Sequence, residues 1–340
     1  MQLRVLCCNP DGGAFLYITR GWENAFKTAG HNFLRWNGQD DVLRSFRPNI
    51  YLGCSGWRQN CPSWAKSQFG TKIAIHVNPY GSSKVGSVAG GPQIDEKQDI
   101  IEWVKEASPD ALFCYAMQNE INKFWNKWQS IVQVPIVSMP TAADSIHYAP
   151  TSIAEQYKCD IGFIGGLWQY KGINIRKYLF PVLQRNDLNC KVYGWSSWPM
   201  RYCGKMSDAD DCKLFSSAKV CPTIVEPHTS VSGIDWPERI FKIAACGSFA
   251  VSDPIVNFDN YLDRAVFPMA NNPEEYLALC CKYTRDETSR TSMARKQRQE
   301  VLAKHTYLHR ISGLLQSLGH INESKEMIDL ANHKLNEAKI

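Results

Sequence analysis

Residues 230–253 read SVSGIDWPERIFKIAACGSFAVSD and predict one helix followed by one buried strand. Asp235 is a suitable helix N-cap, and Pro237 suits a first helical turn. Apolar and small residues then line one side at helical spacing over residues 240–247. The short apolar run 248–252 follows at once, and runs of this kind are typical of buried strands. A helix that leads directly into a buried strand is the repeating unit of an α/β sheet.

The alternation of strand and helix extends from this stretch in both directions. The expected strands are residues 159–164, 190–194, 218–224 and 248–252 in the second half, and 3–8, 31–36, 49–53, 72–77, 111–115 and 134–139 in the first. Alternation with short apolar strands predicts mostly parallel sheets covered on both faces. We therefore predict an α/β fold of two doubly wound, Rossmann-like domains, with C-terminal helices and a ligand site in the cleft between the domains.

Composition shifts suggest where the domains end. Prolines and small polar residues follow residue 139, so we expect a first domain at 1–145 and a linker at 146–157. The second domain is expected at 158–318 and a helical tail at 319–340, because apolar residues there recur every three or four positions. The tail helix either packs against the body of the protein or makes an oligomer contact.

The overall composition excludes several classes of protein. The 340 residues are 44% hydrophobic and 21% charged, which fits a globular chain rather than a disordered one. No apolar run reaches the length of a membrane span, and the N-terminus lacks the pattern of a signal peptide. The thirteen cysteines contain no Cys-x-x-Cys pair, so we expect no zinc site and read them as buried thiols of a cytoplasmic protein.

Positive charge is concentrated at the N-terminus. Residues 1–90 contain ten Lys and Arg against four Asp and Glu, a net charge of +6, whereas the whole chain has +5. One interpretation is a surface that meets an anionic partner such as DNA. The other is an ordinary solvated surface.

The helix start at 235–242 carries the strongest candidate site. Glu238, Arg239 and Lys242 share a polar face there. Free N–H groups and the helix dipole favour a phosphate at this end, and Arg239 adds a planar donor. Glu238 is an acceptor for sugar hydroxyls. The alternative is a surface Glu–Lys pair beside a packing helix.

Two further loops follow buried strands. The stretch FIGGLWQYKG (163–172) places Gly165 and Gly166 at a strand end, where backbone approaches a ligand closely, with Lys171 within reach of an anion. Tyr193 and Gly194 end the strand expected at 190–194, and Lys205 lies in the loop at 202–205. Both loops carry aromatic rings that suit stacking on a base. Core aromatics explain these tyrosines nearly as well.

The first loop of the chain is also rich in glycine. Gly12 and Gly13, which are candidate donor-binding residues, follow Asp11 after the first strand, without the dinucleotide-binding pattern G-x-G-x-x-G. His76 ends the fourth strand on the same sheet edge. Asp11 and His76 are the candidate general bases, since a hydroxyl nucleophile must lose a proton to a nearby acceptor. The alternatives are a turn residue and a strand-end histidine held by its own partners.

The run PERIFKIAACGSFAVSD (237–253), preceded by Gly204 and the strand at 218–224, resembles CgeB-type (spore-maturation) glycosyltransferases of the GT-B fold. NPEEYL (272–277) and the stretch at 305–310 extend the resemblance over residues 159–318. In the first half only the strand order and MPTAAD (139–144), which resembles an interdomain loop, support it.

The resemblance implies a nucleotide-sugar donor held mainly by the second domain and an acceptor held mainly by the first. Gly165 and Gly166 would border the diphosphate with Arg239 nearby, and the loops at 193–194 and 204–205 would hold base and ribose. Related enzymes usually carry a ribose-binding glutamate where this chain has Lys242. Either Glu238 replaces it, or donor recognition differs, or activity is lost. Lys242 also suits neutralisation of the leaving diphosphate.

The expected activity is therefore transfer of a sugar from a nucleotide-diphosphate sugar to an acceptor hydroxyl, activated by Asp11 or His76. Arg239, Lys171 and Lys242 would stabilise the leaving group. We expect no cofactor and no metal, and a glycan, protein or small molecule as acceptor. The alternatives are a modified base in DNA as acceptor, a non-catalytic nucleotide-sugar or glycan binder, and an epimerase of the same architecture.

Overall fold

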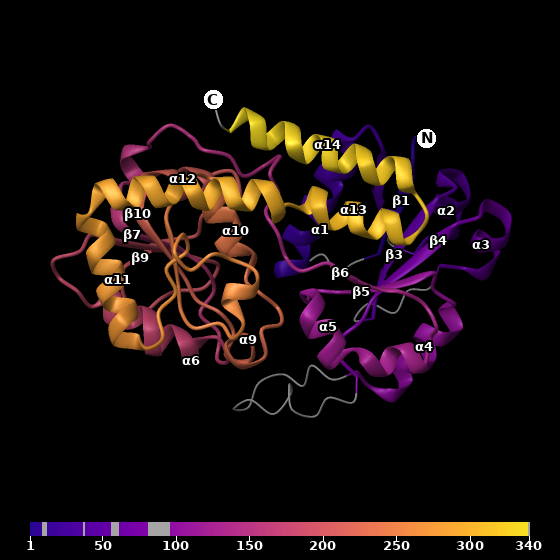
Figure 1. Ribbon diagram of the computed structural model, residues 1–340, viewed down its shortest axis with the longest axis horizontal. Coiled ribbons are helices and arrows are strands. Elements are labelled where there is room, and N and C mark those ends of the chain that lie inside the picture. The colour runs from indigo at the N-terminus through magenta and orange to yellow at the C-terminus, as the bar shows by residue number, and fades with distance from the viewer. Residues whose placement is uncertain (9–11, 37, 56–60, 81–95, 339–340) are drawn as a thin grey trace. The chain divides into compact units, whose positions relative to one another are not determined.

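The computed structural model describes residues 1–8, 12–36, 38–55, 61–80 and 96–338, which form two compact units (Figure 1). Among these residues, unit 1 holds 1–147 and 307–333, and unit 2 holds 148–306 and 334–338. The described chain therefore leaves unit 1 after His147, returns to it at Tyr307, and passes into unit 2 again at Lys334.

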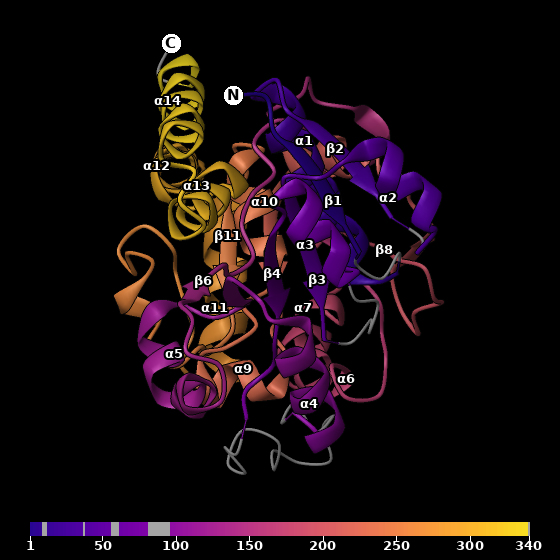
Figure 2. The same cartoon turned by 90° about the vertical axis from the view of Figure 1, so that its right-hand side faces the viewer.

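Unit 1 contains a six-stranded parallel sheet in the order β2-β1-β3-β4-β5-β6 (Figure 2). The strands are β1 (Arg4–Cys7), β2 (Asn32–Arg35), β3 (Ile50–Cys54), β4 (Lys72–His76), β5 (Ala111–Cys114) and β6 (Ile136–Ser138). The helices are α1 (Ala14–Thr28), α2 (Asp40–Phe46), α3 (Ser63–Phe69), α4 (Gln98–Ala107), α5 (Gln118–Phe124), η1 (Asn126–Ser130), α13 (Tyr307–Ser317) and α14 (Ile321–Glu337), the last of which ends in unit 2. Strand order reverses between β1 and β3, as in a doubly wound sheet.

Unit 2 contains a five-stranded parallel sheet in the order β11-β10-β7-β8-β9 (Figure 1). The strands are β7 (Cys159–Ile164), β8 (Cys190–Tyr193), β9 (Tyr202–Gly204), β10 (Ala218–Thr223) and β11 (Ala250–Ser252). The helices are η2 (Glu155–Tyr157), α6 (Gly172–Asn174), η3 (Ile175–Leu179), α7 (Phe180–Leu183), α8 (Asp211–Ser217), α9 (Pro227–Ser232), α10 (Glu238–Ala245), η4 (Phe258–Asn260), α11 (Pro273–Arg285) and α12 (Glu287–Lys304). Here the order reverses between β7 and β10.

Helices cover both faces of the unit 2 sheet. Ile161 and Phe163 of β7 belong to a core that includes η3, α7 and α11. Gly162 points to the opposite face, where a Cβ would lie 3.4 Å from Leu214 of α8. Alternate residues of one strand are therefore buried under different helices, which explains why the strands are apolar without alternation. The predicted pair of parallel α/β sheets with C-terminal helices is confirmed.

The C-terminal helices belong to a different unit from the one expected. Residues 307–318 were assigned to the second domain, but α13 packs in the core of unit 1 with Trp22 and Phe26 of α1. The expected tail also contributes core residues, because Met327 and Ala331 of α14 are buried in the same cluster. The helical periodicity of α13 shows that it has an apolar face but not which sheet that face covers.

In the described part of the chain, no helix combines the length and the hydrophobicity that crossing a bilayer requires. All thirteen cysteines are free thiols, and most of them are buried.

Candidate functional site

The candidate site lies at the carboxyl edge of the unit 2 sheet, where the strand order reverses between β7 and β10. Backbone that leaves neighbouring parallel strands in opposite directions opens a crevice at this point. Gly165 follows β7, Glu226 follows β10 and Asp253 follows β11. Because all five strands are parallel, these residues share one edge.

Arg239 enters this edge from the first turn of α10. Its guanidinium carbon lies 4.5 Å from the ring centre of Phe163, and a Cβ on Gly165 would lie 2.6 Å from its Nη2. Nη1 is buried without a hydrogen-bond partner. Burial lowers the pKa of Arg239 to about 10, against the opposing effect of Glu226, so the group is charged at neutral pH. A buried cationic donor without a partner is suited to an anionic ligand.

Lys171 and Glu226 form an ion pair beside Arg239. The Lys171 Nζ and a Glu226 carboxylate oxygen lie 3.4 Å apart, and the other oxygen, Oε2, is buried without a partner. Burial, followed by the charge of Arg239, lowers the pKa of Lys171 to about 8. Arg239 and Lys171 thus lie near the same Glu226 carboxylate, which pairs with Lys171, and an anion placed here reduces the repulsion between the two cations.

Asp253 holds the backbone that follows β10 through hydrogen bonds. Its carboxylate accepts hydrogen bonds from the backbone N–H of Val225 at 3.1 and 3.3 Å, and the side chain is fully buried. Burial raises the pKa of Asp253 well above its usual range. The carboxyl group fixes the turn between β10 and Glu226.

Three polar side chains that contact one another in sequence lie near the same edge. The Tyr170 hydroxyl lies 3.2 Å from Nδ1 of His228, and Nε2 of His228 lies 3.2 Å from Asp235 Oδ2. The Tyr170 and His228 rings are stacked, with centres 5.8 Å apart. These contacts hold the loop that carries Lys171 in place. Asp235 was expected to cap α10, but that prediction is wrong: α10 begins at Glu238, after Pro237, and Asp235 pairs with His228 at a positive φ of 54°.

The glycines of this edge make close approaches. A Cβ on Gly194 would overlap the carbonyl oxygen of Gly165, and one on Gly166 would overlap the indole of Trp195. The carbonyl of Gly165 also accepts a hydrogen bond from Trp198 Nε1 at 3.0 Å. Glycine at position 194 is therefore required for the backbone contact between the turns that follow β7 and β8, whereas the exposed Trp195 indole beside Gly166 can move aside.

Tyr193 and Lys205 lie further along the edge. Tyr193 is buried, with its ring edge-on to Tyr157 at 5.8 Å. Lys205 is exposed in the loop after β9. Tyr193 therefore packs as a core aromatic, whereas Lys205 is accessible to a ligand.

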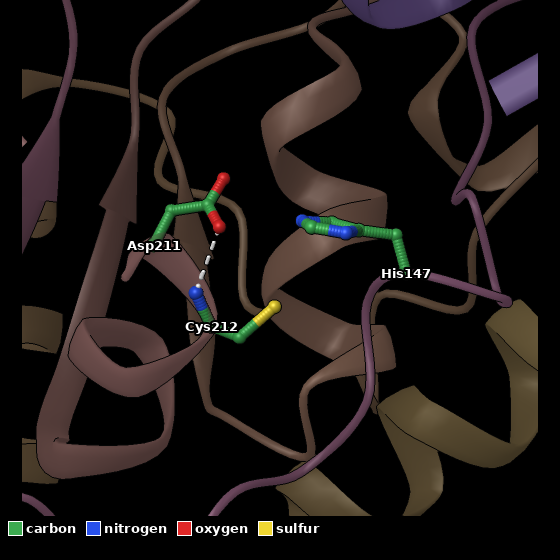
Figure 3. Close-up of side chains that lie close together, drawn as sticks. All are labelled: His147, Asp211 and Cys212. Carbon is green, nitrogen blue, oxygen red and sulfur yellow. Dashed lines mark hydrogen bonds between the residues drawn. The ribbon is translucent and has the colours of Figure 1, made fainter. Parts of the chain in front are cut away.

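Glu238 and Lys242 pair with each other on α10. Glu238 Oε2 lies 2.6 Å from Lys242 Nζ, with side chains 9% and 11% exposed. Lys242 also lies 4.9 Å from the ring centre of Tyr148, whose hydroxyl donates to Asp211 at 2.8 Å. Asp211 in turn accepts the backbone N–H of Cys212 at 2.9 Å (Figure 3). The Glu–Lys pair is thus a partly buried part of a network rather than a surface contact.

Of the candidates in the first half, Gly12, Gly13 and His76 lie in unit 1, and the other nine donor-site candidates lie in unit 2. Asp11 lies outside the described residues. Gly12 precedes Gly13, which adopts a positive φ of 58° just before α1, with open space around both. His76 is 4% exposed, stacked on Tyr115 with ring centres 4.2 Å apart, and its Nδ1 lies 3.7 Å from Cys54 Sγ. This packing favours the strand-end interpretation of His76, and its role as a base stays a prediction.

The site residues predicted from the sequence did not include Glu226, His228 and Asp253. Each follows a buried strand: the polar run EPHT (226–229) comes after β10, and Asp253 comes after β11. Polar residues at the ends of neighbouring strands were the available signal, but strand order was needed to show that they meet.

Residues 176–316, less than half of the chain, match the family model described as glycosyl transferase-like. A search of curated proteins finds no significant match. Solved structures of similar fold include sucrose-phosphate synthase from Thermosynechococcus elongatus, with 11% identity over 97% of this chain and 100% of the other and a TM-score of 0.62. HepE from Anabaena in complex with UDP has 10% identity over 94% and 100%, with a TM-score of 0.62. T4 phage BGT in complex with its UDP-glucose substrate has 12% identity over 98% and 99%, with a TM-score of 0.58.

The class of protein that fold and family match support is a glycosyltransferase of the GT-B type. The GT-B fold expected from the sequence is confirmed. The match of residues 176–316 to a glycosyl transferase-like family model agrees with the expected transfer of a sugar.

Proposed function

We propose that the protein transfers a sugar from a nucleotide-diphosphate sugar to an acceptor hydroxyl, as a CgeB-type enzyme of the cytoplasm. In this proposal unit 2 binds the donor diphosphate at Arg239 and Lys171, beside the turn at Gly165 and Gly166. The single observation that carries it is the buried, unpartnered Nη1 of Arg239 at the strand reversal of the unit 2 sheet. The free thiols of all thirteen cysteines support a reducing compartment.

Charge explains why a diphosphate suits this edge. Arg239 and Lys171 are both desolvated by burial at this edge, where electrostatic interactions are strong, and the two cations repel each other. As the bond to the sugar breaks, negative charge develops on the leaving diphosphate, and Arg239 and Lys171 stabilise it. Lys205 is available for the nucleoside part of the donor, and no step requires a cofactor. Lys242 is paired with Glu238, so neither is free to act alone in its proposed donor role.

A uridine diphosphate sugar is the first donor to test, because solved structures of this fold contain UDP or UDP-glucose. The experiment measures release of UDP from UDP-sugars by the native protein and by two arginine variants. Arg239→Ala is expected to lower the rate at least about 100-fold, the scale of losing a positioned transition-state donor. Arg285→Ala, in a side chain 69% exposed on the same unit, is the matched control and should keep the native rate.

Release of nucleoside diphosphate that disappears only in Arg239→Ala supports an enzyme and excludes a pure binder. Tight donor binding without release would favour the non-catalytic alternative, and isomerisation of the donor sugar without acceptor would favour an epimerase. If neither nucleotides nor nucleotide sugars raise the melting temperature, the proposed donor site is wrong.

The acceptor is proposed to meet unit 1, with Asp11 or His76 as the base. A modified base in DNA is the second candidate acceptor, because the first 90 residues carry a net charge of +6. Two arginines of α2 and its C-terminal end lie over aromatic rings of α3: Arg44 lies 4.0 Å from the ring centre of Trp64, and Arg47, just after α2, lies 5.3 Å from that of Phe69. Duplex DNA should then bind with an affinity that falls steeply with salt. Absence of such binding leaves glycans, proteins and small molecules as acceptors.

A further inference from the structure

A second candidate site lies at the opposite end of the unit 2 sheet. A cavity of about 370 Å³ opens at the amino ends of β10 and β11, beside Ala218, Ser248 and Phe249. We call it the α12 cavity, because Arg290, Arg295 and Arg298 of α12 line one side. Donor-site residues such as Gly165 and Arg239 lie at the carboxyl edge, so the two sites are separated by the length of the strands.

The α12 cavity is strongly basic. Its lining includes three arginines and Lys219, and the described residues that line it include no Asp or Glu. Lys219 pairs at 2.8 Å with Asp160, which lies outside the lining. Three guanidinium groups without a carboxylate in the same cavity repel one another, and an anion removes this repulsion.

Backbone carbonyls hold two of these arginines in place. Arg290 Nη1 donates to the carbonyl of Tyr283 at 2.7 Å, and Arg298 Nε donates to that of Ala245 at 3.1 Å. Arg298 Nη1 donates to the carbonyl of Ala338 at 3.3 Å. Carbonyls are neutral, so these bonds fix the side chains without cancelling their charge. Arginine held in a fixed orientation presents its remaining N–H groups to a phosphate with little loss of entropy.

The remaining lining defines the size and kind of ligand. Thr151, Ser216, Ser248 and Thr291 contribute hydroxyl groups, and Phe215 and Phe249 contribute apolar surface. A concave site of this volume is too small for a nucleic acid or a protein segment of any length. Several guanidinium groups beside hydroxyls match a compact phosphate monoester that also carries hydroxyl groups.

We propose that the α12 cavity binds a small phosphorylated molecule, independently of the donor site. The helix α10 connects the two places: Arg239 lies in its first turn, and Cys246 and Gly247 after its last turn line the cavity. Arg298 is hydrogen-bonded to a carbonyl in the last turn of α10.

The test is calorimetric titration of the full chain with inorganic phosphate and with a hexose 6-phosphate, in a phosphate-free buffer of low salt. Both should bind, and the unphosphorylated hexose should not. Arg295→Ala should weaken hexose 6-phosphate binding at least about tenfold, the scale of one charge-assisted contact. Arg295 is exposed, so the variant should fold normally.

Two controls locate the binding. Lys296→Ala removes one exposed charge from the neighbouring position of α12, which does not line the cavity, and should bind as the native protein does. Arg239→Ala should also keep hexose 6-phosphate binding, even if it loses nucleotides. The proposal is overturned if neither phosphate compound binds, if Arg295→Ala and Lys296→Ala bind equally, or if Arg239→Ala abolishes the binding, which would place the anion in the donor site.

Discussion

Lys171 makes donor binding dependent on pH. Its pKa of about 8, lowered mainly by burial, means that the group is charged at pH 7 and neutral at pH 9. Phosphate groups keep a constant charge over this range, because their second pKa is near 6. We predict that UDP affinity, measured by calorimetry, falls roughly tenfold between pH 7 and pH 9 as one charged contact is lost.

Unfolding does not explain such a fall. A lysine whose folded pKa is about 8, below the usual 10.5, binds fewer protons in the folded than in the unfolded state. Its contribution to the free energy of unfolding therefore rises with pH between these values. Lys171→Arg stays charged throughout, and its affinity should be flat from pH 7 to pH 9. An equally steep profile in this variant would assign the pH dependence to another group.

Gly194 illustrates a second constraint at the residue scale. Gly194→Ala forces a methyl group against the carbonyl oxygen of Gly165, and backbone atoms cannot move aside cheaply. We predict a loss of about 1–3 kcal/mol in the free energy of unfolding, measured in urea. The matched control is Gly313→Ala, at an exposed position inside α13 with open space around it. There alanine should stabilise the protein by about 0.5–1 kcal/mol.

At the scale of elements, α10 contains the ion pair between Glu238 and Lys242, and these two residues can be exchanged with each other by mutation. Lys242→Glu places two acidic side chains one helical turn apart where a pair of 2.6 Å existed, and both positions are largely buried. We predict a loss of about 2–4 kcal/mol in the free energy of unfolding, since an attractive pair is replaced by two like charges at largely buried positions. The exchange of both residues, Glu238→Lys with Lys242→Glu, should recover more than half of the loss.

The double exchange should not restore the whole free energy of unfolding. In the native protein Lys242 also contacts the ring of Tyr148, and a carboxylate at that position gains no cation–π attraction. If the double exchange is no more stable than Lys242→Glu alone, the pair does not stabilise the helix, and Lys242 acts through Tyr148 instead.

The elements could be predicted from local patterns wherever burial dominates. The strand predicted at 159–164 is β7 to the residue, and the others agree within a few positions. The start of α10 could not be predicted in the same way: Asp235 has the chemistry of an N-cap, but its contact with His228 depends on a loop that the tertiary structure sets. Arg239 was found from the pattern of a helix start, and Lys171 and the glycines were found from strand-end patterns. Glu226 and Asp253 join them only through the strand order β11-β10-β7.

At the scale of the whole molecule, the order of segments in the chain determines which parts fold together. The core of unit 1 requires α13, which follows unit 2 in the sequence: Leu308, Ile311, Leu314 and Leu315 are at most 1% exposed in that core. Burying such a side chain contributes about 1.5–3 kcal/mol. Four of them together are comparable to the net stability of a domain, about 5–15 kcal/mol.

We therefore predict that residues 1–147 alone do not fold cooperatively, whereas residues 1–147 joined through a Gly/Ser linker to 307–333 do. Tyr307 also fits against Gly21, and its N–H donates to the carbonyl of Ala143 at 3.0 Å, so the added segment has a defined place to bind. Thermal unfolding followed by circular dichroism measures the outcome. The linked chain carrying Ile311→Asp and Leu315→Asp is the matched control, because it has the same length but cannot bury α13. A cooperative transition in residues 1–147 alone, at the midpoint of the linked chain, would show that α13 only covers a core that is already complete.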